Sequence, residues 1–196
     1  MINQSCGYTN KGGLLMIVYH GSIKKFDHFK KEALVQNLPD HIDTIGIWFT
    51  ADIDSARPFA IGTETIIEKS KTEFWDDGEP KVVQMEKPVQ GFIYRVYMDE
   101  PNLKEYENYE LFMIDRDKYC DYLATKNRNP TWRDQAILLN KEEANAAFRQ
   151  NLQKQGYEGF LIHNTSMYEN VTNLYCIFSE DSIFIADVIQ VEECEN

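Results

Sequence analysis

Two short apolar runs that end abruptly in polar or glycine residues constrain the fold of this chain more than any other feature. The first, Leu14–Tyr19, is followed directly by His20 and Gly21. The second, Ile45–Thr50, ends in two aromatic residues and a hydroxyl. Runs of this length and composition predict buried strands. The glycine permits a sharp turn and the close approach of a ligand to the backbone. If the two strand ends meet in space, they form a slot for a flat, polar ring.

The composition describes a folded chain whose charge argues against binding of duplex nucleic acid. Its 196 residues suffice for one domain with a sizeable core, and 43% of them are hydrophobic. The formal net charge of −12 disfavours a binder of duplex nucleic acid, because such proteins neutralise phosphates with basic side chains. No apolar run is long enough to span a bilayer, and the polar start lacks the apolar core of a secretory signal. A cytoplasmic location without membrane contact is therefore expected.

Several common sites are disfavoured by what the sequence lacks. The cysteines, at positions 6, 120, 176 and 194, are scattered and form no CxxC pair, so no metal site is expected. Cys176 lies in an apolar, strand-like run and is predicted to be a buried free thiol. Neither a GxGxxG nor a GxxxxGK[ST] pattern occurs. The sequence therefore supports neither a dinucleotide-binding Rossmann loop nor a phosphate-binding P-loop.

Periodicity along the rest of the chain predicts a mixed α+β domain. Residues 91–98 alternate like a strand, and residues 141–155 combine helix formers with an apolar stripe. Asp52 or Asp54 is expected to cap a short helix. Further strands are expected at 160–163, 174–178 and 183–191, and further helices at 118–124 and 132–139. Because strands and helices do not alternate strictly, the pattern favours an α+β fold over a doubly wound sheet.

One domain is expected over residues 14–191, after a flexible leader of residues 1–13 and before a tail of residues 192–196. Within it, residues 62–90 are rich in Glu, Lys, Thr and Asp and form an acidic insertion. The composition of this insertion predicts a helical piece followed by a surface loop, with a turn at Asp76–Pro80.

A series of short motifs gives the first indication of a family. They are YHGS (19–22), GIWFT (46–50), SARPFA (55–60), GFIYRVYM (91–98), GYEGFLIHN (156–164) and NLYCIF (173–178). In order and spacing, this set resembles the ADP-ribosyltransferases of the diphtheria-toxin and PARP-like clade, which carry a His-Tyr-Glu triad, and especially their small bacterial and phage members. The resemblance implies a split β-sandwich with peripheral helices, around a cleft that holds NAD in a bent form.

The resemblance also implies roles for individual residues toward NAD as the substrate. His20 would hydrogen-bond a hydroxyl of the adenosine ribose, and the backbone of Gly21 would meet the nicotinamide carboxamide. Trp48, at the family's tyrosine position, and Phe59 would sandwich the nicotinamide ring, with packing in the core as the alternative for both. Ser55 matches a serine that contacts the carboxamide. The complete NAD-binding set implied in this way is His20, Gly21, Ser22, Trp48, Phe49, Thr50, Ser55 and Phe59.

The chain departs from the family at the acidic residue of the triad. The glutamate normally stands directly before the Tyr-x-apolar-aromatic run, and in this chain that position is Leu174. A leucine neither stabilises a cation nor accepts a proton. Glu169, in the preceding loop, is the candidate replacement, so the expected catalytic pair is His20 and Glu169.

Three functions are compatible with these residues. The first is an NAD-dependent mono-ADP-ribosyltransferase that modifies an unidentified acceptor, expected to be a protein, and releases nicotinamide; transfer to water would make it an NAD glycohydrolase. The second, suggested by Leu174, is a degenerate module that binds NAD or ADP-ribose without turnover. The third is a protein-interaction module that acts through the insertion at residues 62–90. The ordered motifs favour the first.

Overall fold

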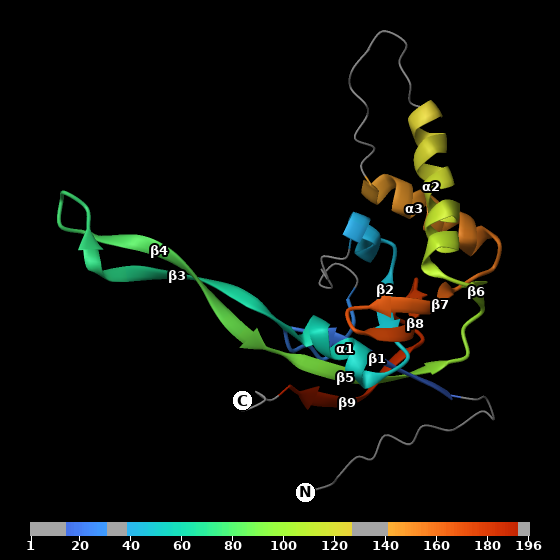
Figure 1. Ribbon diagram of the computed structural model, residues 1–196, viewed down its shortest axis with the longest axis horizontal. Coiled ribbons are helices and arrows are strands. Elements are labelled where there is room, and N and C mark those ends of the chain that lie inside the picture. The colour runs from blue at the N-terminus through green and yellow to red at the C-terminus, as the bar shows by residue number, and fades with distance from the viewer. Residues whose placement is uncertain (1–14, 31–38, 127–140, 192–196) are drawn as a thin grey trace, which may run out of the picture.

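The computed structural model describes residues 15–30, 39–126 and 141–191 (Figure 1). The leader, the tail and the helix expected at residues 132–139 lie outside these ranges. The strands are β1 (Leu15–Ser22), β2 (Ile47–Thr50), β3 (Ile61–Phe74), β4 (Pro80–Gln90), β5 (Phe92–Asp99), β6 (Leu103–Tyr106), β7 (Gly159–Met167), β8 (Asn170–Ile177) and β9 (Ile183–Gln190). The helices are α1 (Ile53–Ala56), α2 (Tyr109–Lys126) and α3 (Lys141–Lys154), with 3-10 turns η2 (Pro39–Thr44) and η3 (Arg57–Ala60).

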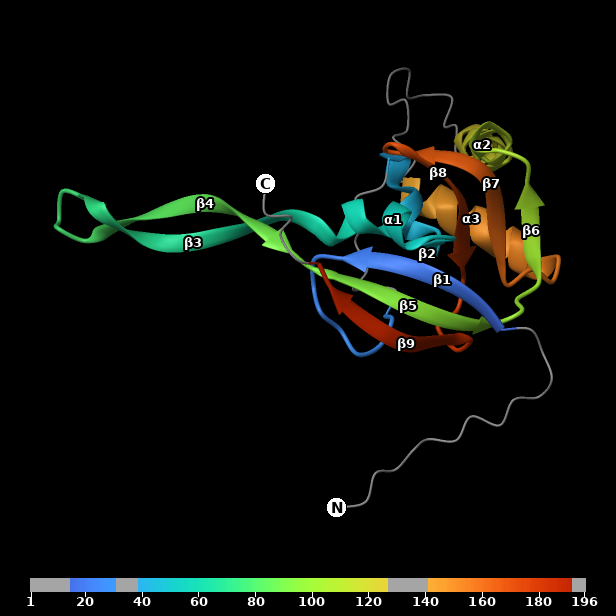
Figure 2. The same cartoon turned by 60° about the horizontal axis from the view of Figure 1, so that its bottom comes forward.

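Seven strands form one hydrogen-bonded sheet that is split in the middle. Their order is β6-β7-β8-β2-β1-β5-β9. β1 pairs with β5 along its whole length, but its register with β2 consists of the pair Tyr19 and Thr50. The sheet therefore opens into a group of four strands and a group of three, which Figure 2 shows as separate layers. The predicted α+β class and the split β-sandwich with peripheral helices are confirmed.

Two larger apolar cores and a smaller third one stabilise the described part of the fold. The first core fills the space between the helices α2 and α3 and the strands β2, β7 and β8, and Phe160 lies within 6.0 Å, between ring centroids, of the aromatic rings of Trp48, Phe112 and Phe148. The second core lies between the two groups of strands. Cys176 is a free, fully buried thiol of the first core, as predicted, and burial raises its pKa well above the usual value.

The insertion at residues 62–90 folds as a β-hairpin, so the expected helical piece and surface loop are wrong. β3 and β4 pair antiparallel and extend away from the rest of the molecule (Figure 1, Figure 2). Thr and Ile recur along β3, and such β-branched side chains fit a pleated strand better than a helix. Gly78, with a φ of 86°, allows the tight turn, which Trp75 and Glu79 close with a 2.7 Å backbone hydrogen bond.

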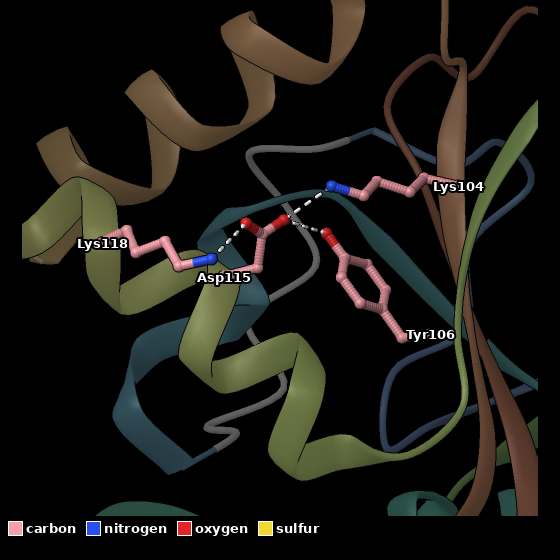
Figure 3. A network of polar contacts seen from close by, with 4 residues as sticks. All are labelled: Lys104, Tyr106, Asp115 and Lys118. Atoms are coloured by element: carbon pink, nitrogen blue, oxygen red, sulfur yellow. Dashed lines mark hydrogen bonds and ion pairs between the residues drawn. The ribbon is translucent and has the colours of Figure 1, made fainter.

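The half-buried carboxylate of Asp115 holds the first half of α2 against β6. The sequence patterns did not predict this short strand. Asp115 accepts hydrogen bonds from Lys104 (2.6 Å) and Tyr106 (2.8 Å) and forms an ion pair with Lys118 (Figure 3). Burial raises the pKa of Asp115, but these hydrogen bonds and lysine charges outweigh burial and hold it below the usual value. The network positions the helix whose first residues reach the site described next.

Candidate functional site

A cavity of about 850 Å³ lies where the sheet splits. Its size is that of pockets that enclose a small organic ligand. β1, β2, β7, β8 and the first turn of α2 all contribute to its wall. The lining residues are Tyr19, His20, Gly21, Ile42, Trp48, Phe49, Thr50, Phe59, Asn108, Tyr109, Glu110, Asn164, Thr165, Ser166, Met167 and Leu174. The two strand ends singled out in the sequence therefore do meet, and they meet at this cavity.

His20 lies in the wall as a buried, neutral imidazole. Its Nδ1 is 2.8 Å from the carbonyl oxygen of Trp48. Since a carbonyl only accepts, Nδ1 carries the proton and Nε2 is the acceptor nitrogen of the ring. Burial lowers the pKa of His20 from 6.5 to about 4, and the Trp48 hydrogen bond only partly offsets this. The rings of Phe29 and Phe49 contact the imidazole at 5.2 and 5.7 Å between centroids and fix its orientation.

Gly21 continues β1 and is packed against another part of the chain. The strand runs on to Ser22 without the expected turn. A Cβ at position 21 would lie 2.1 Å from the carbonyl oxygen of Ala56 and 2.9 Å from the amide nitrogen of Ala60. The absence of a side chain thus lets α1 and η3 approach the strand that carries His20.

The hydroxyl residues of the expected set fall into two groups. Thr50 lines the cavity and donates a 2.7 Å hydrogen bond to the carbonyl of Asp52. Ser55 is buried outside the lining, and its hydroxyl donates to the Asp52 carboxylate at 2.9 Å. Asp52 also accepts from the Ser55 amide, which makes it the cap of α1, one of the two expected choices. Ser22 likewise lies outside the lining, and its hydroxyl accepts from the amide of Lys24 at 3.2 Å.

The two aromatic residues expected to hold a ring both line the cavity. Trp48 is only 5% exposed, packs on Phe160 and donates from its indole nitrogen to the carbonyl of Ile42 at 3.1 Å. It therefore belongs to the core and also contributes to the wall. Phe59 is half-buried and meets the exposed ring of Tyr168 edge-on at 5.7 Å between centroids.

The acidic residue in the wall is one that the sequence patterns did not single out. Leu174 lines the cavity opposite Thr50 in the β2–β8 register. Glu169 lies in the exposed turn between β7 and β8 and is not a lining residue. Glu110, in the first turn of α2, is the acidic residue among the described residues that line the cavity. Asn108, which accepts from the amide of Leu111 at 2.9 Å, caps this helix, and a cap followed by an acid would have marked the helix start.

The comparison with family models agrees with this geometry. Residues 10–187 match the model described as ADP-ribosyltransferase in polyvalent proteins. The chain belongs to this family. No curated protein and no solved structure matches the chain. Family membership assigns ADP-ribosyl transfer as the general activity, and the split sheet with a cavity at the split is the ADP-ribosyltransferase fold expected from the motifs.

Two further features of this ADP-ribosyltransferase concern the described residues only. None of their helices combines the length and apolar character that crossing a bilayer requires. Their His, Cys, Asp and Glu side chains form no group of three or more arranged to hold a metal ion.

Proposed function

We propose that this ADP-ribosyltransferase moves ADP-ribose from NAD to an acceptor, which we expect to be a protein, and releases nicotinamide. The observation that carries the proposal is the state of His20. The neutral imidazole lies in the cavity wall with its Nδ1 hydrogen-bonded to Trp48, and the motif resemblance implies that a histidine at this strand end meets a ribose hydroxyl. Gly21, Trp48, Phe49, Thr50 and Phe59 lie around it in the same wall.

The proposed reaction places specific demands on the wall. The bond between ribose C1′ and the nicotinamide nitrogen breaks, and its electron pair leaves with the neutral nicotinamide. The acceptor nucleophile then attaches to C1′ and loses its proton. Between these events the ribose carries oxocarbenium-like charge, which aromatic side chains do not neutralise but a carboxylate does. Trp48 and Phe59 would hold the leaving ring and exclude water.

The first experiment measures nicotinamide release by the purified protein incubated with NAD, alongside a binding titration. His20→Asn is the matched variant, because its amide can still donate to the Trp48 carbonyl but offers no acceptor at the position of Nε2. We expect release by the wild type and a loss of roughly a hundredfold in the variant. Binding without release would support the degenerate NAD-binding module instead. The absence of both NAD binding and nicotinamide release would contradict the proposal.

We further propose that Glu110 supplies the carboxylate missing at Leu174. Both residues are exposed, but Glu110 lines the cavity and Glu169, in the β7–β8 turn, does not. Removing a charge that acts mainly in the transition state lowers kcat. Glu110→Gln should therefore reduce the kcat of nicotinamide release by roughly tenfold to a hundredfold.

Glu169→Gln is the control for this prediction, since both substitutions remove one charge and keep the side-chain size. We expect Glu169→Gln to change kcat by less than about twofold. Loss of activity in Glu169→Gln, with Glu110→Gln unaffected, would reverse the assignment and support the role predicted for Glu169 from the sequence.

A further inference from the structure

Thr165 carries a buried hydroxyl that no group of the described protein satisfies. The residue is 4% exposed and lines the cavity at the split of the sheet. Its Oγ1 has no hydrogen-bond partner among the described residues. Buried hydroxyls in folded proteins are nearly always hydrogen-bonded, because leaving one unpaired costs free energy. A buried, unpaired hydroxyl in the wall of a ligand-sized cavity therefore requires an explanation.

The neighbouring threonine shows the satisfied arrangement. Thr172 is the partner of Thr165 in the β7–β8 register, and the two side chains share one face of the sheet. Thr172 is 5% exposed, and its hydroxyl donates to the Asp52 carboxylate at 2.6 Å. Burial and position are thus almost the same for the two threonines. They differ in that the described protein provides a partner for only one of them.

A β-bulge in β7 determines the face of the sheet on which Thr165 lies. The register shifts between Ile162 and Thr165, and Asn164 within the bulge has a φ of 49°. Without the extra residue, strict alternation would put Asn164 on the face of Ile162. The bulge puts Thr165 there instead, on the face that also carries Leu174. Bulges occur preferentially beside active sites, where they redirect a side chain.

We infer that Thr165 is a ligand-binding residue whose hydroxyl forms a hydrogen bond with a neutral polar group of NAD, either a ribose hydroxyl or the carboxamide. The inference rests on the proposed use of NAD. On this inference, the hydroxyl would reach the ligand after rotation about χ1 to another staggered rotamer. A phosphate is the less suitable partner, because none of the described lining residues is Lys or Arg, and a buried phosphate without a cation is costly.

The test compares Thr165→Val with Thr172→Val, which each replace a hydroxyl by a methyl group of similar size. Binding of NAD, ADP-ribose and nicotinamide is measured by calorimetry, and stability by thermal unfolding without ligand. For Thr165→Val we expect affinity for NAD to fall by about fivefold to tenfold, with an unchanged or higher Tm, because no hydrogen bond to a described residue is lost. For Thr172→Val we expect a lower Tm and an NAD affinity within about twofold of the wild type.

The outcomes separate this inference from the proposed function. NAD binding by the wild type that stays unchanged in Thr165→Val overturns the role of Thr165 and leaves the use of NAD intact. A lower Tm in Thr165→Val without loss of affinity also overturns it, because the hydroxyl is then structural. If the wild type binds none of the three probes, the proposed function and this inference fail together. A loss of affinity for ADP-ribose or for nicotinamide alone identifies the half of NAD that the hydroxyl contacts.

Discussion

Gly21→Ala is expected to destabilise the protein by about 3 kcal/mol or more, at the upper end of the cost of overpacking a core. The added Cβ would lie 2.1 Å from the Ala56 carbonyl oxygen and 2.9 Å from the Ala60 amide nitrogen. Both contacts are with backbone, so no flexible side chain can move aside. β1 would have to separate from α1 and η3, and Phe59 would move with η3 because its own Cβ is also 2.9 Å away.

Equilibrium unfolding in urea measures this effect, and Gly62→Ala is the matched control. At position 62 an added Cβ meets the Cγ2 atom of Ile23 at 2.9 Å, which is the end of a side chain. We expect that variant to lose less than about 1 kcal/mol, because the side chain can adjust. Equal unfolding free energies for the two variants would show that α1 and η3 yield freely, and that Gly21 is not required for their packing.

His20 is expected to make the protein lose about 3 kcal/mol of unfolding free energy between pH 6.5 and pH 4. Its pKa is about 4 in the folded protein and 6.5 in the unfolded chain. Between these values the unfolded state binds the additional proton, so stability rises with pH. The contribution is complete above pH 6.5 and is lost as the pH falls toward 4. The cause is the burial of the imidazole, which penalises the charged form.

The control separates His20 from the carboxylates, which also become protonated in this range. His20→Asn does not titrate, and every other group of the protein is unchanged in it. The unfolding free energy of the wild type minus that of His20→Asn should therefore increase by about 3 kcal/mol from pH 4 to pH 6.5. A difference that does not vary with pH would mean that the imidazole is hydrated in the folded protein.

Much of the fold could be predicted from local patterns. Four elements lie close to their predicted positions, namely the strands around His20, Trp48 and Tyr94 and the helix α3. They could be predicted because apolar periodicity depends only on residues that are near one another in the sequence. Gly156 follows α3 and has a φ of 89°, the left-handed conformation that glycine commonly adopts just after the end of a helix. The prediction of a helical piece within residues 62–90 was wrong because the Glu residues there also fit a helical spacing. Its β-branched residues and the turn at Gly78 decided the outcome.

The site divides in the same way between sequence and structure. The sequence alone determined that a His-Gly strand and an aromatic strand exist and that Leu174 stands where an acid is expected. Only the tertiary structure decided that Glu110 reaches the cavity and that Thr165 is buried there without a hydrogen-bond partner among the described residues. These facts depend on helix packing and on a one-residue bulge, which join segments far apart in the chain. No local pattern encodes such contacts, because the free energy that selects them arises only when the segments pack together.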